Sequence, residues 1–122
     1  VQPWLATVAL DSAALDIEAI MNRRHYRLYD AVFGTDPAFW RLASPIHRLE
    51  GKPAAPMLMV CSAMRDDSCT AAQEFAAKAV GFGGRVTVLP VALTHMQIND
   101  ELGARSGYTE AVDAFLTSVG VP

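Results

Sequence analysis

Three runs of nearly continuous apolar residues divide the chain, and each is short enough to form a β-strand. They are residues 5–10 ("LATVAL"), 56–62 ("PMLMVCS") and 85–93 ("RVTVLPVAL"). Strands covered by helices on both faces have this continuous apolar character, whereas strands with one face in water alternate between apolar and polar residues. The three runs therefore predict three buried, parallel strands.

Two further segments repeat their apolar residues at helical spacing. The first lies between the second and third strands, and its apolar stripe consists of Ala72, Phe75, Ala76, Ala79 and Val80. Ser68 stands where the N-cap of this helix is expected. The second stripe predicts a C-terminal helix and consists of Tyr108, Val112, Phe115, Leu116 and Val119. Alternating strands and helices predict an α/β fold with crossover helices.

The region from about 16 to 45 departs from this alternation and predicts several short helices with no strand. One of them is expected to begin with Asp36 as N-cap and Pro37 in the first helical position. The aromatic residues of this helical excursion either line a ligand pocket or cover the edge of the sheet. In the first case Tyr26 and Tyr29 are candidate substrate-binding residues. No repeat or linker interrupts residues 1–122, which predicts one domain.

Composition excludes several function classes. The chain has 122 residues, of which 52% are hydrophobic and 19% charged, as in globular proteins. Its net charge of −3, without a basic patch, argues against a nucleic-acid partner. No apolar stretch approaches the roughly 20 residues that span a bilayer, so no membrane partner is expected. The sequence does not identify the compartment, and the cytoplasm is the default expectation.

The two cysteines are too few for a disulfide framework or a zinc site. Cys61 lies within an apolar strand and is predicted to be a small buried residue. Cys69 lies at a helix start, where a thiol can become reactive, but no companion base is near it in the sequence. We therefore predict no metal site and no cofactor.

Polar side chains that could carry chemistry follow two of the predicted strands. His95 comes soon after the third strand, and Asp66 and Asp67 follow the second. In α/β proteins, ligand-binding and catalytic groups gather at the carboxyl ends of parallel strands. A carboxylate beside an imidazole can fix its tautomer and stabilise its protonated form. The alternatives are a histidine of an ordinary loop and aspartates that cap a helix.

From "VALDSAALD" to "YTEAVDAFL" the chain resembles the C-terminal half of an α/β-hydrolase, particularly the esterase and arylformamidase-like branch. "PMLMVCSAMRDDSC" resembles the strand and loop that carry the catalytic acid. "VLPVALTHMQINDELG" resembles the strand and "HFxI"-like motif that carry the catalytic histidine, with Met96 in place of the aromatic residue and Ile98 at the aliphatic position. "YTEAVDAFL" resembles the closing helix.

The resemblance implies the C-terminal part of an α/β-hydrolase fold and a Ser–His–Asp triad with His95 as the general base. The usual Gly-x-x-Asp pattern, counted from Ser62, places the acid at Arg65, so the loop is longer here. Asp66 fits the family's Asp-x-x-apolar spacing, whereas Asp67 directly precedes the expected helix cap. We favour Asp67 as the acid, with Asp66 as the alternative.

The nucleophile motif G-x-S-x-G and the HGGG-type oxyanion motif do not occur in the chain. Because the chain begins without Met at an apolar strand, we interpret it as part of a longer protein. The missing N-terminal half would supply the serine and the oxyanion hole, and this chain alone would be inactive. The expected substrate is a small ester or amide, with Met96 as a further substrate-binding candidate. The alternative is a stand-alone α/β ligand-binding or protein-interaction module without catalysis.

Overall fold

A three-stranded parallel sheet forms the centre of the computed structural model, which describes residues 4–122. The strands lie in the order β1-β2-β3 and are β1 (Thr7–Leu10), β2 (Met57–Ser62) and β3 (Val86–Val91). All three predicted parallel strands are confirmed, each slightly shorter than the apolar run that indicated it, but only β2 is largely buried, and β1 and β3 are partly exposed. Their parallel arrangement brings the three carboxyl ends to one edge of the sheet.

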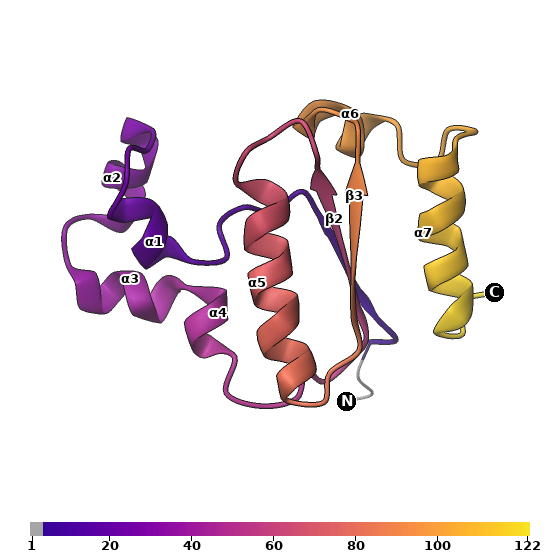
Figure 1. The fold of residues 1–122 in the computed structure, drawn as a ribbon, viewed down its shortest axis with the longest axis horizontal. Coiled ribbons are helices and arrows are strands. Elements are labelled where there is room, and N and C mark those ends of the chain that lie inside the picture. The colour runs from indigo at the N-terminus through magenta and orange to yellow at the C-terminus, as the bar shows by residue number, and fades with distance from the viewer. Residues whose placement is uncertain (1–3) are drawn as a thin grey trace.

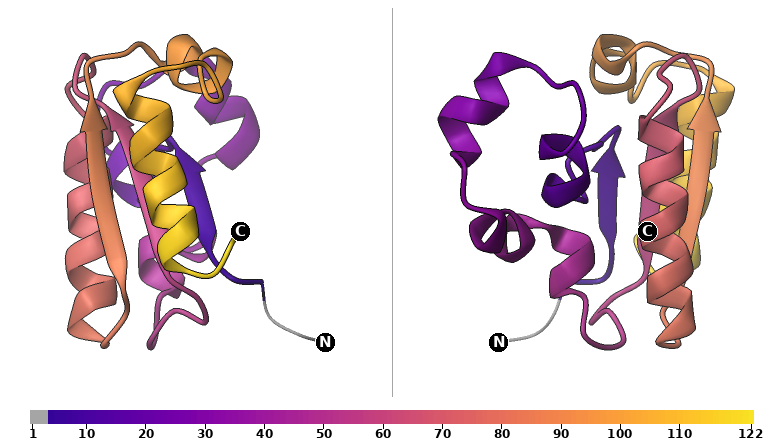
Figure 2. Two further views of the ribbon diagram at one scale, coloured as in Figure 1. Left: turned by 90° about the vertical axis from the view of Figure 1, so that its right-hand side faces the viewer. Right: turned by 60° about the vertical axis from the view of Figure 1, so that its left-hand side comes forward.

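Helices cover both faces of this sheet. Helix α5 (Ser68–Gly81) lies on one face and α7 (Gly107–Ser118) on the other, as Figure 1 and Figure 2 show. Helix α6 (His95–Asp100) follows β3 at the carboxyl end of the sheet. The predicted α/β class is thereby confirmed. Within residues 4–122, no helix combines the length and the apolar character needed to cross a membrane.

The central strand β2 divides the core into two layers. Met59 and Cys61 face α5, whereas Leu58 and Val60 face α7, and none of the four is more than 2% exposed. Side chains alternate between the two faces of a strand, so one strand contributes to both layers. Complete burial of a large apolar side chain stabilises the fold by about 1.5–3 kcal/mol. Because β2 buries such side chains on both faces, its central place in the sheet is strongly favoured.

Helix α5 confirms most of its predicted stripe. Four residues of the stripe are buried: Ala72, Phe75, Ala76 and Ala79. Val80 is 53% exposed, because at 100° per residue it lies about 80° around the helix from Ala72. Ser68 is the first residue of α5 rather than its N-cap. Asp67 takes the cap position but makes no side-chain hydrogen bond to the helix.

The helical excursion contains four short helices beside α5 and away from α7 (Figure 1). They are α1 (Ile17–Met21), α2 (Arg27–Phe33), α3 (Pro37–Ala43) and α4 (Pro45–Arg48). Helix α3 begins as predicted, because the Asp36 carboxylate accepts a hydrogen bond from the Ala38 amide and Pro37 follows it. The sequence therefore predicted both the excursion and the start of its third helix.

One buried serine ties the excursion together. Ser44 Oγ accepts a 2.8 Å hydrogen bond from the backbone amide of Ile17 and donates a 2.7 Å bond to the carbonyl of Trp40. The first bond satisfies an amide at the start of α1 that has no partner within its own helix. The ends of α1 and α3 are thus joined through a single hydroxyl.

Candidate functional site

Three charged or titratable side chains, one from the segment after each strand, lie together at the carboxyl edge of the sheet. Asp11 directly follows β1, Arg65 lies in the loop after β2, and His95 begins the helix after β3. Asp11 has a φ of 56°, in the left-handed region where aspartate and asparagine are more common than most residues. This backbone turn places the Asp11 carboxylate between the other two side chains.

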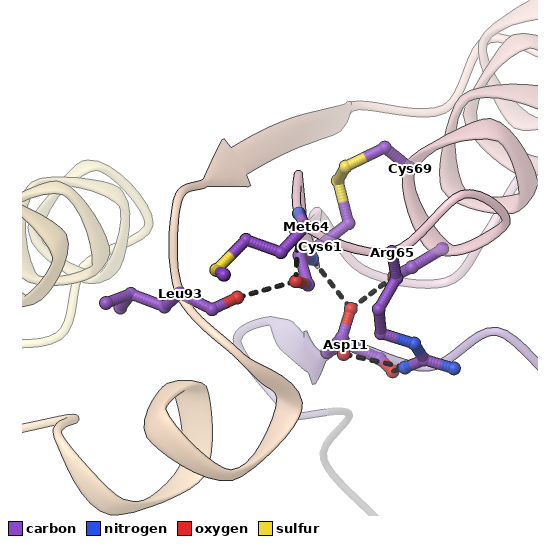
Figure 3. The surroundings of a disulfide bond; sticks show 8 residues. Asp11, Cys61, Met64, Arg65, Cys69 and Leu93 are labelled. Atoms are coloured by element: carbon purple, nitrogen blue, oxygen red, sulfur yellow. Dashed lines mark hydrogen bonds and ion pairs between the residues drawn. A yellow bond between two sulfur atoms is a disulfide. The ribbon is translucent and has the colours of Figure 1, made fainter.

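The Asp11 carboxylate is buried and accepts hydrogen bonds on both of its oxygens. Oδ1 accepts a 2.7 Å bond from the backbone amide of Ser62 and a bond from the hydroxyl of Ser68. Oδ2 accepts a 2.7 Å bond from Arg65 Nη1 and lies 2.9 Å from Nδ1 of His95. Figure 3 shows this carboxylate beside the Arg65 guanidinium. A buried carboxylate with this many donors is held in one orientation.

These contacts determine the charge of Asp11. Burial alone would raise its pKa, but hydrogen bonds from Ser68, Ser62, Arg65 and His95 outweigh burial and lower the pKa from 3.8 to about 2. For Arg65, burial lowers the pKa, but the hydrogen bond to Asp11 together with the nearby negative charges of Asp11 and Asp67 outweighs this effect and raises it. Both groups are therefore ionised at neutral pH, as a buried anion and its partner cation.

The lowered pKa of Asp11 predicts a loss of stability in acid. The contribution is fully present above the unfolded-state pKa of about 3.8 and is lost as the pH falls through the folded-state pKa of about 2. It amounts to about 2 kcal/mol. Urea unfolding at pH 7, 4 and 2 should show this additional loss in the parent protein but not in Asp11→Asn. Parallel pH curves for the two proteins would contradict the assignment.

His95 is the first residue of α6, not part of an extended loop. Thr94 caps this helix through a capping box with Gln97, which fixes the backbone at the point where the imidazole leaves it. The loop before it is held to β2, because Ser62 Oγ donates a 2.5 Å hydrogen bond to the carbonyl of Leu93. The His95 side chain is 58% exposed. Nδ1 of the ring lies beside Asp11, and more than half of the side chain is exposed.

Asp67 and Asp66, the acids predicted from the sequence, do not contact His95 in the part of the chain that the structure describes. Asp67 instead lies 3.3 Å from Arg23 and 3.8 Å from Arg65, and its side chain is 38% exposed. Asp66 is exposed. The catalytic role of either carboxylate stays a prediction, while the observed contact to the imidazole belongs to Asp11.

Sequence reasoning overlooked Asp11, although a usable signal was present. "VALD" is an apolar strand followed at once by an acidic residue, the same arrangement that drew attention to His95. The contact joins residues 84 positions apart, so only the topology of the sheet reveals it. The carboxyl ends of all three predicted strands are equally suitable places for a functional side chain.

The candidate substrate-binding tyrosines border a cavity of about 460 Å³ next to this site. Its walls include Tyr26 and Tyr29 from the excursion, and Arg65 and Asp67 from the loop after β2. Met96 does not line this cavity, and its side chain is 70% exposed. The tyrosines and Met96 as substrate contacts stay predictions. Among residues 4–122, no cluster of histidine, cysteine and carboxylate side chains could hold a metal ion.

The two cysteines form a disulfide, which corrects the expectation of two separate thiols. Cys61 at the end of β2 is bonded to Cys69 at the start of α5 (Figure 3). Cys61 is buried, as predicted, but neither residue is a free thiol. The bond closes the loop that contains Ser62 and Ser68, the two residues whose groups bind Asp11 Oδ1.

Removing the disulfide should destabilise the fold. In the chain-entropy model, a bond between cysteines eight residues apart contributes about 2.5 kcal/mol. The variant Cys61→Ala/Cys69→Ala is therefore expected to unfold at a lower guanidinium concentration than the parent. Adding a thiol reductant should shift the parent midpoint and leave the variant unchanged. An unchanged parent midpoint would show that the bond contributes nothing.

Comparison with known proteins identifies the fold. No protein-family model matches the sequence, and a search of curated proteins also finds no match. Among solved structures, the chain is similar to an esterase from the Planctomycetes species Thermogutta terrifontis, with a TM-score of 0.66 and 18% sequence identity. The match covers 95% of this chain but 42% of the esterase. The chain thus has the α/β fold of part of an esterase, as the sequence indicated.

Proposed function

We propose that this chain is the C-terminal part of a serine hydrolase that cleaves carboxylic esters or amides. The observation that carries the proposal is the 2.9 Å contact between Nδ1 of His95 and a buried carboxylate at the carboxyl edge of the sheet. The contact uses Nδ1, and the His95 side chain is 58% exposed. The likeness of the fold to part of an esterase supports the same conclusion.

In the proposed reaction, His95 acts as the general base. Its Nε2 accepts the proton of a serine hydroxyl while the serine oxygen attacks the carbonyl carbon of the substrate. The protonated imidazole then gives this proton to the leaving alcohol or amine. In the second half of the reaction, His95 activates the water that hydrolyses the acyl-enzyme. This chemistry requires no metal ion or organic cofactor.

The serine and the oxyanion donors belong to the proposed N-terminal half, because their motifs do not occur here. By itself the chain is expected to have no hydrolase activity. The cavity bordered by Tyr26 and Tyr29 is the proposed site for part of the substrate, with Met96 beside His95 as a further contact. Both halves would contribute to this substrate site.

The test is to express the complete reading frame that contains this segment. The purified protein should hydrolyse a short p-nitrophenyl ester, and a fluorophosphonate probe should label one serine outside residues 1–122. Addition of a chelator should leave the rate unchanged. Absence of both hydrolysis and labelling would overturn the proposal.

A non-catalytic interaction module is the second candidate, and one observation favours it. Helices α2 and α3 expose large apolar side chains, among them Leu28 at 71%, Val32 at 57% and Leu42 at 62%. Such a surface is typical of a site that contacts another protein or domain. A reading frame that lacks a G-x-S-x-G elbow, together with the absence of probe labelling, would favour the module.

A further inference from the structure

We propose that Asp11 is the positioning residue that holds the imidazole of His95 in its productive tautomer, and that Arg65 is the cation that balances the charge of the Asp11 carboxylate. The catalytic consequence rests on the proposed hydrolase function. The orientation of the ring does not depend on that function and can be measured directly.

Burial distinguishes Asp11 from its competitors. The Asp11 side chain is fully buried, whereas that of Asp67 is 38% exposed and faces two arginines. A carboxylate in water exchanges its partners readily, but a buried carboxylate keeps the partners that satisfy it. Asp11 therefore provides a fixed acceptor for the ring, which the exposed loop carboxylates do not.

The Asp11 carboxylate is held before it contacts the ring. Its Oδ1 is bound from both ends of the disulfide-closed loop, by the Ser62 amide and the Ser68 hydroxyl. These bonds direct Oδ2 toward His95. Because the positions of Oδ1 and of the backbone are both fixed, little orientational freedom remains for Oδ2 to lose during a reaction.

Arg65 balances the charge of the Asp11 carboxylate beside the ring. The family spacing counted from Ser62 places the acid at position 65, and this chain has a guanidinium there. Its Nη1 is 3.5 Å from Nδ1 of His95 and 2.7 Å from Asp11 Oδ2. Unpaired, this cation would repel a protonated imidazole. Asp11 neutralises it and bonds the ring with the same oxygen.

The chemistry of this contact is specific. In the neutral ring, Nδ1–H donates to Asp11 Oδ2, so the lone pair is on Nε2, where the proposed serine proton is accepted. When Nε2 gains that proton, the ring becomes a cation beside the Asp11 anion. Asp11 stays ionised throughout and transfers no proton.

The test is the tautomer of His95, observed by ¹⁵N NMR of protein labelled in its three histidines. The variant His95→Gln identifies the signals of this ring. At a pH where the ring is neutral, the parent should show a protonated Nδ1 and an unprotonated Nε2. Asp11→Asn should lose this pattern, because an amide can offer Nδ1 a donor and thereby favour the Nε2–H tautomer.

Two matched variants make the result decisive. Asp67→Asn and Arg65→Gln should both keep the Nδ1–H tautomer, because neither removes the Asp11 acceptor. A parent ring without a proton on Nδ1, or loss of the tautomer in Asp67→Asn, would overturn the inference. The tautomers of the parent protein and of Asp67→Asn can still be measured if Asp11→Asn fails to fold.

This measurement separates the inference from the proposed function. The expected tautomers in a complete protein that hydrolyses no ester would sustain the positioning role and defeat the hydrolase proposal. If the complete protein hydrolyses esters but the tautomer of His95 does not depend on Asp11, the hydrolase proposal would stand and the positioning role would fail. Neither result requires the activity of the isolated chain.

Discussion

Replacing His95 with alanine in the complete protein should lower kcat for a short ester by roughly 10⁴- to 10⁶-fold. The reason is that the substitution removes the proposed general base, which would leave only substrate binding and oxyanion stabilisation. The fold should survive, because the side chain is 58% exposed and the α6 cap depends on Thr94 and Gln97. Steady-state kinetics together with a melting curve would measure both effects.

His47→Ala is the matched control, since it removes an imidazole from the helical excursion rather than from the site. Its kcat should remain close to that of the parent protein. Full ester hydrolysis by His95→Ala would eliminate the assignment of the general base, and with it the hydrolase proposal.

The second large effect concerns the acid. Asp11→Asn should lower kcat by about 10⁴-fold, the size of the loss when the orienting aspartate of a serine protease is changed in the same way. Asp66→Asn and Asp67→Asn should change kcat by less than about tenfold, because Asp66 is exposed and the partly exposed ion pairs of Asp67 contribute at most about 1 kcal/mol. All three variants keep the shape of the side chain, so their kinetics on one ester can be ranked directly.

The ranking also tests the assignment made from the sequence. If Asp67→Asn had the largest loss of kcat, the loop after β2 would have to rearrange so that Asp67 reaches His95 in the complete protein. Equal activity in all three variants would mean that none of these aspartates contributes to turnover. In either case the contact between Asp11 and His95 would be structural rather than catalytic.

The sequence predicted the parts of the fold that depend on local periodicity. Continuous apolar runs identified the strands, and the spacing from Ala72 to Ala79 identified α5. These signals depend on which faces of an element are covered, and both faces of β2 are buried. The position of His95 at a strand end followed from the same pattern.

The details of the site were less predictable, because they depend on contacts between distant segments. Asp66 and Asp67 were chosen for their spacing along the loop, yet the carboxylate beside the ring comes from another strand. Ser68 was expected to cap α5, but its hydroxyl bonds Asp11 instead. The pairing of Cys61 with Cys69 likewise needed three-dimensional proximity.

The disulfide also bears on the compartment. Such bonds are typical of secreted, periplasmic or extracellular proteins and are rare in the cytosol of mesophiles. The Cys61–Cys69 bond therefore weighs against the cytoplasm as the default expectation. Whether the bond forms in the living cell can be measured by alkylating free thiols before lysis.

The left-handed backbone at Asp11 restricts what mutation can place there. Residues with a β-branched or bulky side chain are strained at a φ of 56°, so glycine, asparagine and aspartate are the residues that fit readily. In a library randomised at position 11, selection for folded protein should retain these three. Selection for ester hydrolysis should retain aspartate alone, and the difference between the two surviving populations would separate what the position does for folding from what it does for catalysis.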